Sequence, residues 1–492
     1  MGTRMKYRHA IWSFLLILII VLTMSEPRTV SAGETLPYDT YTYDYYGDAR
    51  YTPAAYVPQA AIGGEGWECG PMKNPMDLTV AEDGTIYIAD TDNNRIIILD
   101  QLLHYEGVIT EYDYQGTRTA FQSPGGVTTA GELLYIADTG NRRVIALNEK
   151  LETVKIIENP QSDVLGEGYL FEPMKVSVDY AGRAYIIAKN TYQGILSFSA
   201  QGSFRGFTGK IEVSLSPYEK IWRKLTTKAQ RSKQQLYIPT EFTGMEIDED
   251  GFIYATNIDS KGIQSIRRLN PKGEDVIQKS AKERLSGDLN WRFMGDYSGP
   301  SRIVDVVIRK QRIYSAVDAQ RGRIFTYDHE GNLLYIFGGI GTQTGTFTKP
   351  VAIEALGDDI LVLDAAKNCI MVFNATEYGD CINKAVGFRY DGNETESVAY
   401  WNKVLELDNN NELANLGLGK AYLASGDNKK AMSSFEKAKN RHYYSISYKR
   451  YRNELLKNNL KFVFTAAVVI SLGYLLIRKE RKIRRVRYEK KG

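Results

Sequence analysis

The sequence predicts an all-β, six-bladed propeller, followed by a small all-α module and one transmembrane helix. Three observations lead to this prediction. A unit of roughly 50 residues recurs over residues 53–374. The apolar spacing then changes from alternation to a helical period, and an apolar run precedes a strongly basic C-terminus. At 492 residues, with 43% hydrophobic and 25% charged residues, the chain is long enough for these parts.

The N-terminus has the pattern of a secretory signal peptide. Three cations precede an apolar run at Ile11–Met24, and residues 30–32 are small, as expected at a cleavage site. We therefore expect residues 1–32 to be a signal peptide, with an uncleaved anchor as the alternative. No Cys follows the run, which argues against a lipid anchor. A tyrosine-rich segment, residues 33–52, comes next. The cations are Arg4, Lys6 and Arg8, and the tyrosines are Tyr38, Tyr41, Tyr43, Tyr45, Tyr46 and Tyr51.

An internal repeat fills residues 53–374. The segment Pro75–Asp100 recurs 49 residues later as Pro124–Leu147. Each copy has two alternating apolar runs around an Asp/Gly turn, then a polar turn and a third run, which is the pattern of consecutive antiparallel strands. Such a sheet cannot bury both faces alone, so six copies predict six blades stacked around an axis. The weaker copies begin at Pro173, Phe242, Ser301 and Pro350.

The polar turn of the first two copies carries an Asp-x-x-Asn-x-Arg motif. Together with the preceding Tyr-Ile-Ala, this motif resembles the NHL repeat, and the resemblance covers about Tyr51–Phe373. It implies an NHL-type ring closed by a strand from the far terminus, for which Ala54–Ala61 is the candidate. We expect the motif to be structural, because Asp can bond the local backbone and pair with Arg; a ligand or metal site is the alternative. The motif residues are Asp90, Asn93 and Arg95, then Asp138, Asn141 and Arg143, then Asp318 and Arg323 in copy 5, and Asp364 in copy 6, where Cys369 holds the Arg position.

A basic insertion, Ser214–Gln235, separates the third and fourth copies. Its apolar residues fall at helical spacing, so a helix across one face of the propeller is expected. Such a helix is either a lid or docking site for an acidic partner, or a loop without a role. The candidate partner-binding residues are Trp222, Arg223 and Lys224.

Residues 381–457 have helical spacing and follow a short linker at Asn374–Asp380. Small and aromatic residues here resemble one TPR unit, with a weaker copy 34 residues earlier. Two repeats are too few for a free solenoid, so the module is expected to lean on the propeller, on a helix at His442–Leu456, or on a partner. TPR pairs bind peptides or proteins, which makes Tyr422 and Phe435 candidate partner-binding residues; a rigid stalk is the alternative. The matching residues are Leu418, Gly419, Tyr422, Gly426, Ala431, Phe435 and Ala438, and in the weaker copy Ala385, Phe388 and Trp401.

The apolar run Phe462–Ile477 predicts a transmembrane helix over residues 461–478. The run covers about 24 Å, so the flanking Lys461 and Arg478 would have to reach the membrane surface. The last fifteen residues carry nine Lys or Arg against two Glu, which predicts a cytoplasmic tail at residues 479–492. The signal and the tail agree that the bulk of the chain is extracytoplasmic, on a single-pass protein of the cell membrane.

Composition favours a binding or scaffold protein. Without the basic tail the chain is net acidic, which argues against nucleic-acid binding. We expect a protein partner, another membrane or cell-surface component, and no cofactor; the resemblance implies an accessory beside a transport system, and a purely structural spacer is the alternative. The ligand or partner and the oligomeric state do not follow from the sequence.

Enzymatic readings have less support in the residues. Propellers of this shape include zinc-dependent lyases and calcium-dependent lactonases. Only His104 and His329 lie in the repeat region, too few for a zinc lyase. A calcium site needs only carboxylates and amides, so a lactonase-like, gluconolactonase-type hydrolase remains the alternative function. Three Cys and no CxxC argue for unpaired structural thiols, although ring closure could bring Cys69 to Cys369, with Cys381 left over.

Overall fold

The computed structural model describes residues 36–166, 168–210, 241–259, 262, 264–277, 287–288 and 299–489. The chain divides into two units, Met1–Pro37 and Tyr38–Gly492, and the account below concerns the second. The expected signal peptide and the basic insertion, with Trp222, Arg223 and Lys224, lie outside the described residues.

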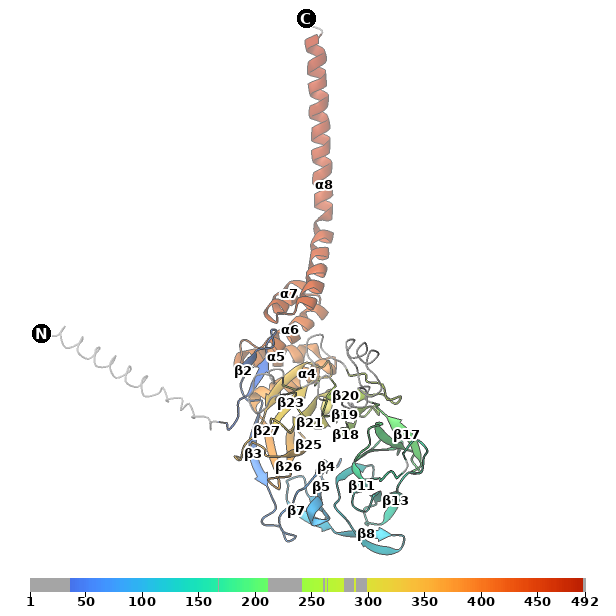
Figure 1. Cartoon of the computed structure of the whole chain (residues 1–492). Coiled ribbons are helices and arrows are strands. Elements are labelled where there is room, and N and C mark those ends of the chain that lie inside the picture. The colour runs from blue at the N-terminus through green and yellow to red at the C-terminus, as the bar shows by residue number, and fades with distance from the viewer. Residues whose placement is uncertain are drawn as a thin grey trace, which may run out of the picture. The chain divides into compact units, whose positions relative to one another are not determined.

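Six β-sheets form the blades of a propeller, as the repeat predicted (Figure 1). In each sheet neighbouring strands are antiparallel, and the strands that come from one repeat copy follow chain order. The first strands, β4, β10, β14, β18, β21 and β25, contact one another in a closed ring around the axis. The bounds are β4 Asp77–Val80, β5 Ile86–Asp90, β6 Arg95–Leu99 and β7 Tyr105–Ile109; β10 Gly126–Ala130, β11 Leu133–Asp138, β12 Arg143–Leu147 and β13 Thr153–Ile157; β14 Pro173–Val178, β15 Ala184–Ala188, β16 Ile195–Phe198 and β17 Phe204–Thr208; β18 Phe242–Ile247, β19 Ile253–Asn257 and β20 Ile266–Leu269; β21 Ile303–Ile308, β22 Tyr314–Asp318, β23 Arg323–Tyr327 and β24 Leu333–Phe337; β25 Pro350–Leu356, β26 Asp359–Asp364 and β27 Cys369–Ala375.

The ring closes by pairing the two ends of the repeat region. Strand β3 (Tyr56–Ile62) is the fourth strand of blade 6 and pairs antiparallel with β27, with Val372 opposite Ala60. The candidate closing strand Ala54–Ala61 is thereby confirmed, with its start two residues later. Because this pairing joins residues about 300 positions apart, blade 6 cannot form until both ends of the ring are in place.

The core lies between neighbouring blades. Alternating side chains of each sheet pack on the next blade, and one such cluster joins Ile88 and Ile97 of blade 1 to Leu361 and Ile370 of blade 6. These four residues are fully buried. Full burial of a side chain of this size contributes about 1.5 to 3 kcal/mol, so the inter-blade contacts stabilise the ring as a whole.

The tyrosine-rich segment is part of the propeller rather than a separate leader. Strands β1 (Tyr41–Tyr43) and β2 (Ala49–Tyr51) form a hairpin, and Tyr41 pairs with Ile336 of β24. Blade 5 is therefore a six-stranded sheet in the order β2-β1-β24-β23-β22-β21. A second short hairpin, β8 (Glu111–Tyr114) with β9 (Thr117–Ala120), links blades 1 and 2.

Four helices form two antiparallel pairs beside blades 5 and 6 (Figure 1). Each begins at a residue whose side chain accepts a hydrogen bond from a first-turn N–H, which satisfies an otherwise unpaired donor. Gly419 of α6 allows close approach, since a Cβ there would lie 2.6 Å from the Phe435 ring of α7. The helices are α4 Glu377–Tyr390, α5 Glu394–Leu407, α6 Glu412–Ala424 and α7 Asn428–Lys437, and their N-caps are Thr376, Asn393, Asn411 and Asp427.

The expected linker at Asn374–Asp380 is wrong. Strand β27 runs to Ala375 and α4 begins at Glu377, so only the N-cap Thr376 separates sheet from helix. The hydroxyl of Thr376 donates to the carbonyl oxygen of Ala54, 2.5 Å away, just before the closing strand. Helix α4 is therefore fixed to blade 6 instead of swinging on a loop.

The last helix, α8, runs without a break from Arg441 to Glu489, 49 residues. The sequence pattern suggested a helix at His442–Leu456 and a separate membrane span, and the structure joins them. Among the described residues, α8 is the one helix long and apolar enough to cross a membrane, with a mean hydropathy of 2.2 over its most apolar window. At 1.5 Å per residue it is about 73 Å long, far more than a bilayer core requires.

Candidate functional site

The Asp-x-x-Asn-x-Arg turn of blade 1 is held together by its own side chains. Asp90 is fully buried, and its Oδ2 accepts hydrogen bonds from Arg95 Nε at 2.6 Å and Asn93 Nδ2 at 2.8 Å. Its Oδ1 accepts the N–H of Lys73 at 2.7 Å, and the Arg95 guanidinium donates to the carbonyl oxygen of Gly70 at 2.9 Å. Both oxygens are therefore occupied in fastening the loop that enters the blade.

Blade 2 repeats this arrangement with one addition. Asp138 Oδ2 accepts from Asn141 Nδ2 at 2.7 Å and from the Tyr112 hydroxyl at 2.6 Å. Arg143 Nε lies 3.6 Å from the same oxygen, and its guanidinium stacks over the Tyr114 ring at 3.9 Å. The hairpin between blades 1 and 2 is thus fixed to the motif.

Blades 5 and 6 depart from the expected pairing. Asp318 has Arg321 at 3.5 Å as its cation, whereas Arg323 donates to the carbonyl oxygens of Asp39 and Gly338, at 2.6 and 2.5 Å. The predicted pairing of Asp318 with Arg323 is therefore wrong, because Arg323 instead bonds the N-terminal segment to the blade.

Asp364 has no Arg partner but stabilises its turn through the backbone. It accepts the N–H groups of Thr348, Lys349, Ala366 and Lys367, at 2.6 to 3.1 Å. All three cysteines are free, so no disulfide joins Cys69 to Cys369. Cys369 and Cys381 are buried, and Cys69 is half-buried.

A buried charged cluster at the propeller axis was not anticipated from the sequence. Lys175 of β14 contacts Asp77 of β4 and Asp305 of β21, the latter at 3.2 Å. All three side chains are at most 11% exposed. Asp77 Oδ2 also accepts the N–H of Val127 at 2.9 Å, and Asp305 Oδ2 accepts that of Ile353 at 3.2 Å. One lysine thus joins the inner strands of blades 1, 3 and 5 across the axis.

Two further carboxyl groups make this axis acidic. Glu246 of β18 accepts the N–H of Ile308, and burial together with the nearby Asp305 raises its pKa to about 8. Burial and the neighbouring carboxylates also raise the pKa of Glu354 well above its ordinary value. Burial lowers the pKa of Lys175, but the two aspartates outweigh this effect and raise it overall. Within the described part of the chain, no group of His, Cys, Asp or Glu is arranged to hold a metal ion.

The repeat alignment contained a signal for this cluster. Asp77, Lys175 and Asp305 occupy the same position of copies 1, 3 and 5, where copies 2, 4 and 6 have small residues. The small residues make room: a Cβ on Gly244 would lie 2.2 Å from an Asp305 oxygen. The alternation of charged and small side chains from one copy to the next therefore marks the strand position that faces the propeller axis. The small residues are Gly126, Gly244 and Ala352.

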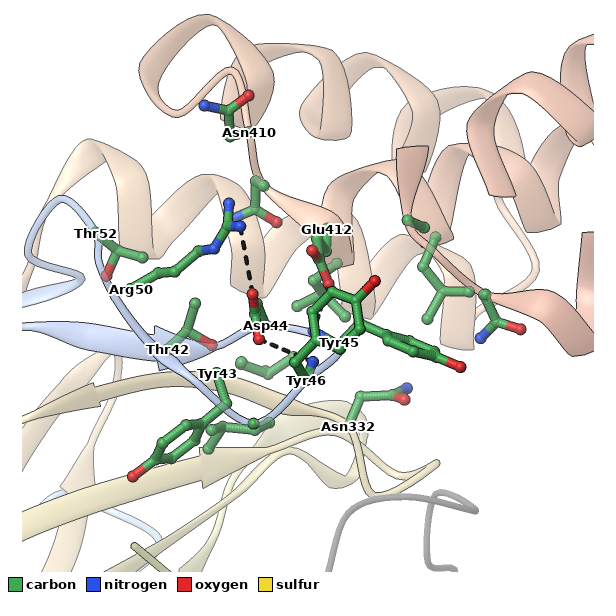
Figure 2. A pocket seen from close by; sticks show the side chains of 18 of the residues that line it. Thr42, Tyr43, Asp44, Tyr45, Tyr46, Arg50, Thr52, Asn332, Asn410 and Glu412 are labelled. Carbon is green, nitrogen blue, oxygen red and sulfur yellow. Dashed lines mark hydrogen bonds and ion pairs between the residues drawn. The ribbon is translucent and has the colours of Figure 1, made fainter. Parts of the chain in front are cut away.

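A cleft of about 1500 Å³ lies where the β1–β2 hairpin, blade 5 and the helices meet (Figure 2). Ion pairs join its walls. Asp44 of the hairpin turn lies 3.3 Å from Arg50 and 3.9 Å from Lys439, and Lys439 lies 2.8 Å from Glu412 of α6. Glu412 also accepts the N–H of Tyr45 at 2.9 Å. Although burial raises the pKa of Asp44, backbone N–H groups and the two cations lower it overall, so Asp44 stays ionised at neutral pH.

The walls of the cleft combine aliphatic and aromatic side chains. Leu416, Leu413 and Ile446 line it from α6 and α8 and are partly exposed. Tyr46 and Tyr51 stand at its edge and are 74% and 82% exposed. Apolar groups beside exposed tyrosines are typical of surfaces that bind other proteins.

The two aromatic candidates of the helical module differ in position. Phe435 is fully buried against Gly419 and stacks on Tyr443 at 5.3 Å, so its side chain has no surface to offer a partner and serves the core. Tyr422 is only half-buried, with Lys430 above its ring at 5.5 Å. Neither residue lines the cleft.

No family model matches the chain, and no curated protein matches its sequence. Its fold is similar to virginiamycin B lyase from Staphylococcus aureus, with 12% identity, 65% of this chain and 100% of that chain covered, and a TM-score of 0.40. It is also similar to a streptogramin B lyase (14% identity, 69% and 87% covered, TM-score 0.38) and to a Bacteroides thetaiotaomicron protein of unknown function (13%, 67% and 80%, TM-score 0.42). At these values the similarity says nothing about what this chain binds or converts. The chain is a six-bladed β-propeller with a C-terminal helical region and one apolar helix that could span a membrane.

Proposed function

We propose that this chain is a membrane-anchored binding protein, with its propeller and TPR-like helices outside the cell membrane and its basic tail in the cytoplasm. The cleft of about 1500 Å³ between hairpin, blade 5 and helices carries the proposal, as the place where a partner protein binds. The partner is another membrane or cell-surface protein, and the chain serves as its accessory, as beside a transport system. The signal 1–32, the span 461–478 and the tail 479–492 are proposed with the limits given by the sequence, whereas the propeller reaches from Tyr41 to Ala375 and the helices begin at Glu377.

The walls of the cleft are fixed relative to each other. Asn383 of α4 accepts from the Tyr335 hydroxyl of blade 5 at 2.7 Å and donates to the Tyr56 hydroxyl at 3.2 Å. Lys420 of α6 pairs with Glu330 of the turn between β23 and β24. Binding to such a preformed site costs little ordering entropy, which favours a surface that uses both parts.

The size of the cleft favours an extended segment over a small molecule. Small-ligand pockets are about 300 to 1000 Å³, below the volume found here. The charges Asp44 with Arg50, and Glu412 with Lys439, already neutralise each other, so the cleft does not demand a highly charged ligand.

Strand β2 offers backbone groups to such a segment. Among the described strands, only β1 pairs with β2, so its other edge is open. Thr52 N–H bonds to Thr40 O, so the pairing alternates and the N–H groups of Ala49 and Tyr51 point away from β1. Both residues line the cleft. An extended peptide can add to such an edge while its side chains reach Leu413 and Leu416.

Site-directed photocrosslinking in living cells tests the proposal. A photoreactive residue at Leu416 is expected to crosslink to one membrane or cell-surface protein, whereas the same residue at Leu407, which is 43% exposed and outside the cleft, is not. Tyr51→Pro should reduce the adduct at least fivefold because it removes an outward N–H, and Tyr51→Ala, which keeps that N–H, should reduce it less. Equal adducts at Leu416 and Leu407, or none at either, would refute the proposed site.

Topology is tested separately. Protease added to intact spheroplasts should remove the propeller while a tag on Gly492 stays protected. Protection of the propeller would reverse the proposed orientation. For the hydrolase alternative, the described residues offer no metal cluster, and we expect no lactone hydrolysis with or without calcium. Turnover abolished by a chelator would favour the hydrolase.

A further inference from the structure

Helix α8 presents different residues to different surroundings above its apolar run. One face packs on the helical module: Tyr443 stacks on Phe435, and Ser447 is fully buried. A second face lines the cleft through Ile446 and Lys449. Successive residues are about 100° apart, so these two faces leave a third part of the circumference unoccupied.

The third face carries a seam, which we define as Tyr444, Tyr448, Tyr451, Leu455 and Asn458. The spacing alternates between four and three residues, which is the heptad pattern of a coiled coil. Tyr444 and Tyr448 stack with their rings 6.4 Å apart and 6° from parallel, and Tyr448 and Leu455 are 48% and 44% exposed. The spacing continues in phase into the apolar run, where all seam positions but Thr465 are apolar and the pattern is no longer diagnostic; the Thr465 hydroxyl donates to the carbonyl oxygen of Lys461 at 2.7 Å. The apolar residues there are Phe462, Val469, Leu472 and Leu476.

Lipid cannot cover the upper part of the seam. At 1.5 Å per residue, Tyr451 lies about 17 Å and Tyr448 about 21 Å above Phe462, where the apolar run begins. Helices at the membrane surface bury their apolar groups to only about 5 to 10 Å. Leu456 and Leu460 fall outside the seam, but they lie within that depth of Phe462. The tyrosines of the seam therefore need a protein surface.

We propose that the seam pairs with the seam of a second copy of this chain, as a parallel two-helix coiled coil that continues through the membrane. A common membrane orientation makes identical helices parallel and brings equal depths together. Asn458 is the single polar position above the membrane, and an amide can both donate to and accept from its own copy, which sets the register. A heptad pattern drifts by about 20° per heptad on a straight helix, so the pair would supercoil left-handedly.

The contact area limits the strength of this pairing. The helix is about 48 Å long from Tyr444 to Leu476, and with a helix width of about 10 Å the pair buries on the order of 1000 Å² in total. This is near the lower limit for a specific interface. The dimer should therefore form in the plane of the membrane, where copies are concentrated and aligned, and dissociate on dilution in detergent.

The test is cysteine crosslinking of two differently tagged full-length copies, co-expressed, in intact membranes and in a Cys69→Ser background. Leu455→Cys lies on the seam, and Lys457→Cys, two residues away and also exposed, lies off it. We expect the first to give an adduct that carries both tags at a yield at least tenfold above the second. Neither site is buried, so both variants should fold. Asn458→Asp, which brings two negative charges together, should lower the Leu455→Cys yield at least fivefold.

Equal yields at the two positions would overturn the inference, and so would a set of Leu455→Cys adducts in which none carries both tags, which would identify a different partner. The inference rests on the membrane anchorage proposed above. That anchorage is tested separately, by whether the chain sediments with carbonate-washed membranes. Crosslinking failure in chain that does sediment therefore counts against the dimer alone.

Discussion

Lys175→Met removes the cation that the described residues place in the charged cluster at the propeller axis. The side chain keeps its length, but Asp77 and Asp305 lose their buried partner. Breaking a buried ion pair by removing one member costs about 3 to 5 kcal/mol, because an uncompensated charge remains. The free energy of unfolding should fall by this amount at pH 8. Blades 1, 3 and 5 should loosen together, since the lysine joins all three.

The stability lost in Lys175→Met should be smaller at low pH, because the carboxyl groups of the cluster are then protonated. In the native protein burial already raises the pKa of Asp77, to about 6, despite the lowering effect of Lys175. Without the lysine the pKa of Asp77 and Asp305 rises further in the folded state, whereas the unfolded value stays at 3.8. The folded variant then binds more protons than the unfolded chain, so its stability falls as pH rises. In the variant the pKa of Asp77 lies above its native value of about 6, so this carboxyl group is protonated near pH 5 and the loss of stability should be smaller there than at pH 8.

Urea unfolding of the full-length protein in detergent, followed by far-UV circular dichroism at pH 5 and pH 8, measures this effect. Lys430→Met removes a solvent-exposed ion pair with Asp427 and should lower the free energy of unfolding far less than Lys175→Met does, at either pH. The triple variant that adds Asp77→Asn and Asp305→Asn should recover much of the stability, since the two aspartate charges are removed together with the lysine. An equal loss at both pH values, or a loss like that of the surface control, would refute the reasoning.

Two further predictions concern the propeller axis and the helical module. Glu246→Gln keeps the acceptor for the Ile308 N–H. Because the pKa of Glu246 is raised from 4.5 to about 8, the contribution of protonated Glu246 to stability is present below pH 4.5 and is lost as pH rises through 8. The variant should therefore be roughly 2 kcal/mol more stable than wild type at pH 8.5 and equally stable at pH 4.5. A wild-type protein with the same pH profile as the variant would contradict this. Phe435→Ala should lower the stability of the helical module by about 3 to 5 kcal/mol, because its ring is fully buried. Tyr422→Ala should lower it by less than half as much, because that ring is only half-buried. Limited proteolysis under urea measures both effects. Equal effects would show that the packing of Phe435 is not what holds α6 to α7.

Local pattern was sufficient for the repeat and its strands. The alternation in Pro75–Asp100 and Pro124–Leu147 reports which face of each strand is buried, and a six-fold recurrence of a sheet with two apolar faces leaves few packings other than a ring. The closing strand came instead from the resemblance to the NHL repeat, which implies a ring closed by a strand from the far terminus, and the pairing of β3 with β27 confirms it. Local period also predicted the two parts of α8, but as separate helices, and the structure joins them.

The sequence alone thus determined six blades, the helices and one apolar helix, because each depends on spacing within a few dozen residues. Only the tertiary structure decided what those elements bring together. Lys175 meets residues 98 and 130 positions away, and the tyrosine-rich segment pairs with β24 nearly 300 positions later. Such contacts depend on ring closure and on how α4 leaves blade 6, which no local period encodes. The cleft and the contacts within the axial cluster are products of that closure, although the alternation of charged and small residues that marks the axis was already present in the sequence.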